Sequence, residues 1–284
     1  MEINIKNITD TFKKHGICLL SVAEYNKGET EYSCVLPFDN CHNCYSVAKA
    51  FTVTAIGMLC DEGKLTINQR VVDLLGHYLP KDYDPLWEKV RVADLLAHKF
   101  GISEGFLDID AEDPSKFGTD YLKYCFTREL YEDLFDKRTY SDGAYYLLSR
   151  IVSEVAGENL CSYLMSRLFV PLGFKEVAWS VCPLGHSMGA TGLYIRTDDM
   201  LKLGVLYLEN GICNGKRIIS ENWCKTVLDN GFELKERSCG SGRFAKSGMY
   251  GQMLYICKNE GKAIAWHAHD RSGAVKKALA ELEM

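Results

Sequence analysis

Long apolar runs are missing from this chain of 284 residues. Its longest apolar stretch, residues 50–60, falls short of the ~20 residues that a membrane span requires, and the largely charged segment 61–64 follows it. The first residues lack the basic start, the apolar middle and the small-residue cleavage site of a signal peptide. We therefore expect a cytoplasmic protein that has no membrane partner.

Blocks of basic residues are also missing, and the formal net charge is -5. Nucleic-acid-binding proteins carry a basic patch or stripe, so we expect no nucleic-acid partner. The chain has no internal repeat and no low-complexity segment. With 47% hydrophobic and 25% charged residues, its composition is that of an ordinary globular protein.

A second C-x-x-C pair is missing although the chain has 12 cysteines. Cys41 and Cys44 form the one such pair, whereas a zinc site needs further ligands and a redox site needs a thioredoxin-like context. Without an export signal, the cysteines are better interpreted as thiols than as disulfides. We therefore expect no metal and no other cofactor.

Strand-like patterns occur at both ends of the chain, and helical patterns occur between them. An N-terminal hairpin is predicted at about residues 16–36, with its turn at 27–29, and further strands are predicted at about 240–270. Helical patterns dominate residues 46–170. The economical architecture is an α+β fold whose antiparallel sheet joins the terminal strands, flanked by helices, with an inserted all-helical region. We expect residues 1–284 to form a single domain.

Ser46 and Lys49 open the longest apolar stretch in an S-x-x-K pattern. In the first turn of a helix, this spacing places a hydroxyl and an amine on one face. A lysine held out of water near other cations loses basicity, and it can accept a proton from serine. Ser46 alone could be an N-cap, but Lys49 lies among apolar neighbours. We interpret Ser46 as a nucleophile and Lys49 as its proton acceptor or electrostatic activator.

Lys246, Ser247 and Gly248 stand at the start of a strand-like run in the C-terminal part. A glycine at such a place lets a strand approach a ligand closely. A plain turn before a strand is the alternative interpretation. In this order along the chain, however, S-x-x-K and K-S-G together are far more specific than either motif alone.

These motifs resemble the serine β-lactamase and penicillin-binding-protein superfamily, most of all its class C-like branch. The resemblance covers nearly the whole chain, from about residue 16 to the last helix. It implies a β-lactamase/transpeptidase-like fold and a groove between the sheet region and the helical region. The segments that carry the resemblance are 45–52, 95–102, 140–142, 192–200 and 246–252.

The resemblance also implies roles for residues outside the S-x-x-K pair. Tyr140 corresponds to the tyrosine that exchanges protons with the nucleophile and the leaving group. Lys246 would orient a substrate carboxylate and raise the positive potential at Tyr140. Ser247 and Gly248 would contact the substrate, and the backbone N–H groups of Ser46 and Met249 would hold the oxyanion.

Asp142 departs from the family pattern, which usually has asparagine at this position. An ionised aspartate accepts hydrogen bonds but cannot donate them. It would hold Lys49 protonated and would favour a cationic substrate group. Residues 141–143 can also be aligned with an S-D-N motif, although the surroundings fit less well.

The histidines are interpreted as structural. His98 is expected to buttress the groove, and His267 and His269 are expected to share one face of an edge strand. The sequence therefore favours a serine hydrolase that forms an acyl-enzyme on an amide, ester or β-lactam of small-molecule or peptide-like character. The alternatives are an esterase or D-amino-acid peptidase with little β-lactamase activity, and a non-catalytic binding protein on the same scaffold.

Overall fold

The computed structural model describes residues 3–36, 41–238 and 240–284. They divide into two compact units. Unit 1 comprises Met1–Val47, Phe169–Ala178 and Leu193–Met284, and unit 2 comprises Ala48–Leu168 and Trp179–Gly192. The single domain with an inserted helical region stays a prediction. Among the described residues, none of the helices has the length and apolarity that crossing a membrane demands.

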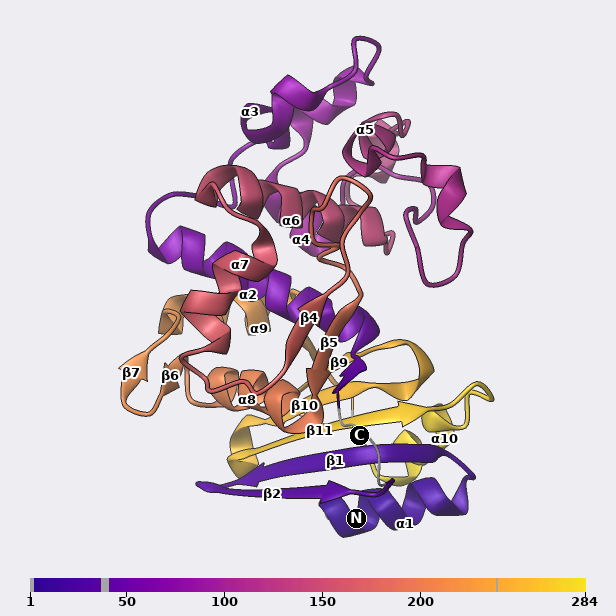
Figure 1. Ribbon diagram of the computed structural model, residues 1–284, viewed down its shortest axis with the longest axis vertical. Helices are drawn as coiled ribbons and strands as arrows, with labels where there is room; N and C mark the ends of the chain where they lie inside the picture. The colour runs from indigo at the N-terminus through magenta and orange to yellow at the C-terminus, as the bar shows by residue number, and fades with distance from the viewer. Residues whose placement is uncertain (1–2, 37–40, 239) are drawn as a thin grey trace. The chain divides into compact units, whose positions relative to one another are not determined.

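Unit 1 contains a six-stranded antiparallel sheet. The first and last long strands of the chain are neighbours in it, with a register that runs from Cys18↔His269 to Asn26↔Lys262 (Figure 1). The predicted fold class, in which the N- and C-terminal strands share one antiparallel sheet, is therefore confirmed. In spatial order the strands are β2 (Glu29–Cys34), β1 (Cys18–Asn26), β11 (Lys262–His269), β10 (Met253–Cys257), β9 (Arg243–Ser247) and β8 (Lys235–Glu236).

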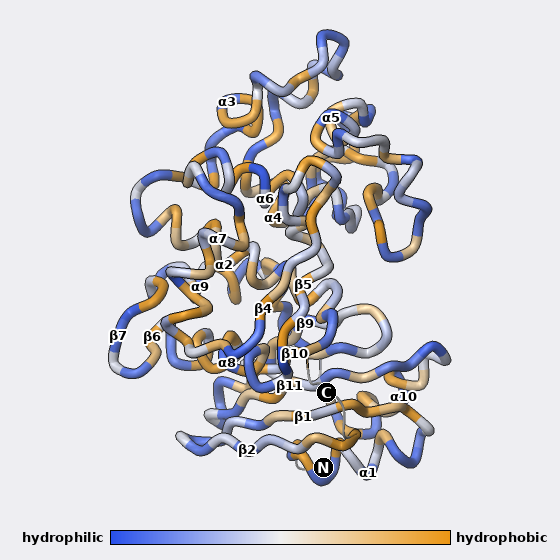
Figure 2. The backbone as a smooth tube through the Cα atoms, in the orientation of Figure 1, coloured by the Kyte–Doolittle hydropathy of each residue, from blue (hydrophilic) through white to orange (hydrophobic). Residues whose placement is uncertain are grey.

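Helices cover both faces of this sheet. α8 (Thr197–Leu208) packs against β1, β10 and β11, and α1 (Ile5–Lys14) packs against β1 and α10 (Val275–Glu281). The ring of Phe12 meets that of Trp266 edge to face at 5.5 Å. Our sequence analysis did not predict α1, although Ile5, Ile8 and Phe12 have helical spacing. Hydrophobic and hydrophilic residues mix along α1, as expected for a helix with one buried face (Figure 2).

Shorter elements complete unit 1. A small sheet has the order β3-β5-β4, and its strand β4 ends where the chain passes into unit 2. Our sequence analysis did not predict this sheet, because strands of three or four residues give little periodicity. These elements are β3 (Cys41–Asn43), the 3-10 turn η1 (Tyr45–Val47), β4 (Val177–Trp179), β5 (Leu193–Arg196), β6 (Ile212–Cys213), β7 (Lys216–Arg217), α9 (Glu221–Asn230), η7 (Met249–Gly251) and η8 (Lys258–Glu260).

Unit 2 is built from helices around α6 (Asp142–Ala156), which packs against α2 (Ala48–Asp61), α3, α4, α5 and α7. Nearly every residue of α2 is buried, as its apolar sequence predicts. The predicted helix at 46–62 begins two residues later as an α-helix, because Ser46 lies in η1. The other elements are α3 (Val71–Leu75), η2 (Gly76–Tyr78), η3 (Pro85–Lys89), α4 (Val92–Ala97), η4 (Pro114–Phe117), α5 (Tyr121–Phe126), η5 (Glu132–Leu134), α7 (Leu160–Leu164) and the π-helical η6 (Met165–Phe169).

The eleven cysteines that the structure describes form no disulfide bond with one another. Cys41 is half-buried on β3 and Cys44 is buried just after it. Cys18 and Cys34 are exposed. The expectation of thiols rather than disulfides is therefore confirmed for these residues.

Candidate active site

Ser46 lies in η1, a turn that follows the small sheet. The N–H of Cys44 donates to the carbonyl of Leu193 at 2.9 Å, and that of Tyr45 donates to Asn43 Oδ1 at 2.8 Å. Tyr45 has a φ of 48°, in the left-handed region that non-glycine residues rarely adopt. The backbone just before Ser46 is thus held by specific contacts in an unusual conformation, as is common next to a functional residue.

The strand β9 carries Lys246 and Ser247, and it packs against η1 within unit 1. Gly248 follows this strand, where a Cβ would lie only 2.5 Å from the carbonyl oxygen of Cys44. No other residue fits there without moving the backbone of one of the two segments. The structure therefore brings the segment around Ser46 and the K-S-G segment together, although they are distant along the chain.

Lys246 forms an ion pair with Glu233, and both side chains are buried. Glu233 has a φ of 65°, so it is a second non-glycine residue in the left-handed region. Our sequence analysis missed Glu233, because it belongs to no motif and lies thirteen residues before Lys246. The pair lowers the positive charge that we expected Lys246 to contribute.

Lys49 lies in α2 of unit 2 with none of its surface exposed. Its Nζ donates to Asp142 Oδ1 at 2.7 Å and to the carbonyl of Ala190 at 3.0 Å. The same Nζ lies 4.7 Å from the centroid of the Tyr140 ring. Lys49, Tyr140 and Asp142 are thus brought together, and Lys49 does not lie on a solvated face.

Tyr140 is 39% exposed, so its side chain reaches solvent. The ring lies 4.7 Å from that of His98, at an interplanar angle of 34°. His98 ends α4 with a φ of 57°, and its Nδ1 accepts from the N–H of Ser141 at 3.2 Å. The side chain of His98 therefore supports the Tyr140 segment, and its expected place beside a groove stays a prediction.

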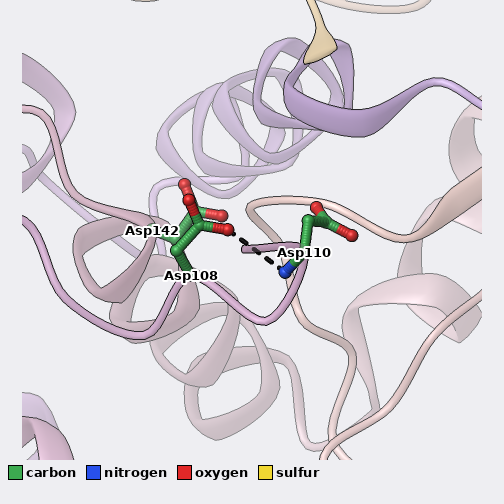
Figure 3. Close-up of side chains that lie close together, drawn as sticks. All are labelled: Asp108, Asp110 and Asp142. Carbon is green, nitrogen blue, oxygen red and sulfur yellow. Dashed lines mark hydrogen bonds between the residues drawn. The ribbon is translucent and has the colours of Figure 1, made fainter. Parts of the chain in front are cut away.

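Asp142 is the first residue of α6 and belongs to an acidic group with Asp108 and Asp110 (Figure 3). One carboxylate oxygen from each residue lies within 4.8 Å of the other two. Burial raises the pKa of Asp108 and of Asp110, and the charge of Asp142 raises both further. Among the described residues, this is the group whose carboxylates are close enough to hold a metal ion, although Lys49 already pairs with Asp142.

The acidic group was not found from the sequence. Asp108 and Asp110 form a D-x-D pattern in a polar segment, a signal too common to single out. The N–H of Asp110 donates to Asp108 Oδ1 at 3.1 Å (Figure 3), and the hydroxyl of Thr191 donates to Asp110. These contacts fix two further carboxylates beside the ion pair of Asp142.

A cavity of about 550 Å³ lies beside the K-S-G segment within unit 1. Ser247 and Gly248 line it, as does the side chain of Val275 from α10. Arg237 and Lys276 add two cations to its lining, and Asp270 adds one anion. The cavity next to Ser247 thus has charged residues of both signs in its lining.

The site residues that we predicted fall into two sets. Ser46, Lys246, Ser247, Gly248 and Met249 belong to unit 1. Lys49, Tyr140 and Asp142 belong to unit 2, where α2 begins directly after η1 along the chain. That both sets form one catalytic site stays a prediction.

One family model and several curated proteins are similar to this chain. The family model described as Beta-lactamase matches residues 8–283. "Penicillin-binding protein 4" of Amycolatopsis lactamdurans is 30% identical over 62% of this chain and 53% of its own length. "6-aminohexanoate-dimer hydrolase" of Paenarthrobacter ureafaciens is 24% identical over 78% of this chain and 59% of its own length. The chain thus spans about half the length of these curated relatives.

A likeness to solved structures supports the fold. The penicillin-binding protein homologue from Caulobacter crescentus superposes with a TM-score of 0.72 at 15% identity, over 98% of this chain and 97% of the other. At this identity the likeness concerns the fold alone. The nearly complete match to the family model, together with this fold, shows that the chain belongs to the β-lactamase family.

Proposed function

We propose that this protein is a serine hydrolase that forms an acyl-enzyme at Ser46. The observation that carries the proposal is the packing of η1, with Ser46, against β9, with Lys246 and Ser247. The serine of the first motif and the K-S-G segment of the second are thus neighbours within unit 1. The family membership and the hydrolase name of one curated relative add support.

In the proposed reaction, Ser46 Oγ bonds to the substrate carbonyl carbon while its proton passes to the base formed by Lys49 and Tyr140. The N–H groups of Ser46 and Met249 hold the resulting oxyanion. The proton then moves to the departing amine or alcohol as the C–N or C–O bond breaks. Water next gives a proton to the same base and its hydroxide to the acyl carbon, and Ser46 leaves with that proton.

The ion pair of Lys49 determines which roles we assign to Lys49 and Tyr140 in the proton transfer. A carboxylate at 2.7 Å from Nζ favours the ammonium form, so Lys49 acts as an electrostatic activator. Tyr140 then accepts the serine proton as a phenolate and returns it as a phenol. Because Asp142 neutralises much of the Lys49 charge, the positive potential at Tyr140 is weaker than it would be with an asparagine at position 142.

Two features bear on the substrate class. Within unit 2, the carboxylates of Asp108, Asp110 and Asp142 favour a cationic group such as an amine. Within unit 1, the cavity beside Ser247 has the cations Arg237 and Lys276 and the anion Asp270 in its lining. We propose a small, peptide-like amide or ester that carries an amine. Because Asp142 cannot donate to an acyl amide, we propose an esterase or D-amino-acid peptidase with little β-lactamase activity.

A non-catalytic binding protein on the same scaffold is the second candidate. The observation that favours it is that both motif lysines have a carboxylate partner, Asp142 for Lys49 and Glu233 for Lys246. Ligand binding that survives Ser46→Ala, without turnover of any acyl substrate by the unaltered protein, would support this alternative.

We also propose a cytoplasmic location. It is supported by the absence of disulfides among the described cysteines, since thiols persist in a reducing compartment.

Covalent labelling tests the acyl-enzyme. The protein is incubated with a fluorescent penicillin or with a fluorophosphonate, and the modified peptide is identified by mass spectrometry. We expect a fluorophosphonate adduct at Ser46, its loss in Ser46→Ala, and normal labelling of Ser33→Ala, in which a half-buried serine of β2 is removed. A folded protein that gains no mass at Ser46 from either probe contradicts the proposal.

Substrate preference is tested with a chromogenic cephalosporin, a p-nitrophenyl ester and a D-amino-acid amide. We expect the ester or the amide to be hydrolysed faster than the cephalosporin. Rapid cephalosporin hydrolysis would instead identify a β-lactamase.

A further inference from the structure

The turn η7, which carries Met249, is held in an unusual conformation. Tyr250 within it has a φ of 58°, and its ring meets that of Tyr45 edge to face at 5.3 Å. Tyr45 is itself left-handed and directly precedes Ser46. Two strained residues thus face each other, one beside each proposed oxyanion donor. Such strain persists only where the surroundings enforce it.

The side chain of Gln252 accounts for one part of this enforcement. Its Nε2 donates to the carbonyl of Met249 at 3.1 Å and to that of Ala268 at 2.6 Å. Its Oε1 accepts from the N–H of Ala268 at 3.2 Å. Because one end of the amide faces two carbonyls and the other faces an N–H group, these contacts define which end is nitrogen. Gln252 therefore ties η7 to the strand β11.

His267 extends this network towards Ser46. The strand β11 lies between β1 and β10, so our placement of His267 and His269 on an edge strand was wrong, and the side chain of His267 is fully buried. Its Nδ1 lies 2.9 Å from Gln252 Oε1, and its Nε2 lies 3.1 Å from the carbonyl of Ile195 in β5. Ile195 pairs with His42 in β3, the strand that leads into η1.

We propose that Gln252 and His267 are positioning residues that hold η7 and η1 in a fixed relation, so that the N–H groups of Met249 and Ser46 form one oxyanion site. The effect of this arrangement on catalysis rests on the proposed hydrolase function. The bracing, that is, the contacts that hold η7 and η1 together, does not. All the contacts lie within unit 1. The contacts run from Met249 through the side chains of Gln252 and His267 to Ile195 and the strand before Ser46, and only one of the two His267 contacts is a hydrogen bond.

A count of the available protons shows that the two side chains contribute differently. Each ring nitrogen of His267 faces an oxygen acceptor, whereas a neutral imidazole has one N–H. Burial, and to a smaller extent the nearby His42, lowers the pKa of His267 to about 3, so the ring is neutral near neutral pH. One of the two contacts then has no proton, and the three hydrogen bonds of the Gln252 amide fix the turn.

Hydrogen–deuterium exchange tests the bracing without reference to activity. In Gln252→Ala, we expect backbone amides in peptides covering 248–252 and 44–47 to exchange about tenfold faster than in the unaltered protein, because local opening becomes easier. Gln252→Glu keeps the size but loses the donors, so it should behave similarly at neutral pH. Unchanged exchange in both peptides for both variants would overturn the proposal.

Ser21→Ala is the matched control. Ser21 lies opposite His267 in the β1–β11 register, and its hydroxyl forms a buried hydrogen bond with Thr197 at 2.6 Å. The variant loses a buried hydrogen bond in the same part of the sheet, but not one of the contacts to η7. If it accelerates exchange at 248–252 as much as Gln252→Ala does, the effect is general loosening and the proposal fails.

Ester hydrolysis tests the catalytic consequence. For Gln252→Ala we expect kcat to fall by about 10- to 100-fold with little change in KM, since a displaced oxyanion donor acts mainly on the transition state. The affinity for a boronic acid, which forms a tetrahedral adduct, should fall by the same factor as kcat/KM. Faster exchange with unchanged kcat would overturn the positioning role. If the unaltered protein hydrolyses no ester, the hydrolase proposal fails, and the exchange result alone decides the bracing.

Discussion

Lys49 in unit 2 and Lys246 in unit 1 are both buried, and each pairs with a carboxylate, but the two pairs differ in origin and surroundings. Asp142, the partner of Lys49, belongs to a sequence motif, whereas Glu233, the partner of Lys246, belongs to no motif. Lys49 has no exposed surface, whereas Lys246 keeps 8%. The comparison teaches that a motif locates a cation, while its effective charge depends on a neighbour that the motif does not include.

The largest change in the free energy of unfolding is expected from replacing Lys49, the more deeply buried of the two lysines. Lys49→Met leaves Asp142 buried beside Asp108 and Asp110 without its cation, so we expect a loss of about 3–5 kcal/mol in the free energy of unfolding. Urea unfolding measures it. Lys64→Met removes an exposed lysine that pairs with Glu62 and should change the stability little. Equal losses in both variants would contradict the importance of burial.

The carboxylate partners are compared by converting each to its amide. Asp142→Asn should destabilise the protein by about 2 kcal/mol, because the fully buried Lys49 loses its counter-charge but keeps the carbonyl of Ala190. The variant also restores the usual family residue, so we expect faster cephalosporin hydrolysis, by about tenfold. Thermal unfolding and initial rates with the chromogenic cephalosporin check the two effects. A stable variant with an unchanged rate would show that Asp142 does not limit β-lactam chemistry.

Glu233→Gln makes the same chemical change in unit 1. We expect a smaller loss, about 1 kcal/mol, because Lys246 retains some contact with water that can hydrate its charge. Urea unfolding of this variant beside Asp142→Asn gives the comparison directly. A larger loss for Glu233→Gln would mean that exposure does not rank the two ion pairs.

The smallest change in stability is expected at Asp108, which lies beside the Lys49–Asp142 ion pair. Because the folded-state pKa of Asp108 is raised, its contribution to stability is present below about pH 4 and is lost as the pH rises through the folded value. Asp108→Asn removes this titration. After allowance for solvent screening, we expect a gain of about 0.5 kcal/mol near neutral pH and none below about pH 4. Urea unfolding at several pH values measures it.

Asp113→Asn is the control of opposite sign. Hydrogen bonds from the backbone and side chain of Ser115 lower the pKa of Asp113, so it contributes stability above its unfolded pKa and loses it in acid. Its replacement should therefore weaken the protein at neutral pH. If both variants shift stability in the same direction, the raised pKa of Asp108 is not the cause.

Much of the fold was predictable from residues close together in the chain. Alternation predicted the hairpin, and a long apolar stretch predicted the helix α2, because both patterns are formed by residues close together in the chain. The small sheet was missed because its strands are too short for a period to emerge. The edge assignment of His267 failed because strand order depends on pairing between the two ends of the chain.

The candidate site divides in the same way. The segments around Ser46, Tyr140 and Lys246 could be predicted from motif spacing. Glu233 and the acidic group could not, because their importance comes from what they contact and a single glutamate carries no signal along the sequence. Gln252 lies in the 246–252 segment, but its contacts with Met249 and Ala268 could not be predicted.

The amino-acid sequence by itself determined the fold class and the segments that carry nucleophile, lysine and tyrosine, since patterning and motif spacing are local properties. Only the tertiary structure decided which carboxylate neutralises each lysine and which side chains brace the turn of Met249. Those partners are brought together by strand register and helix packing, and ion pairs and hydrogen bonds act over a few ångströms in space regardless of separation along the chain.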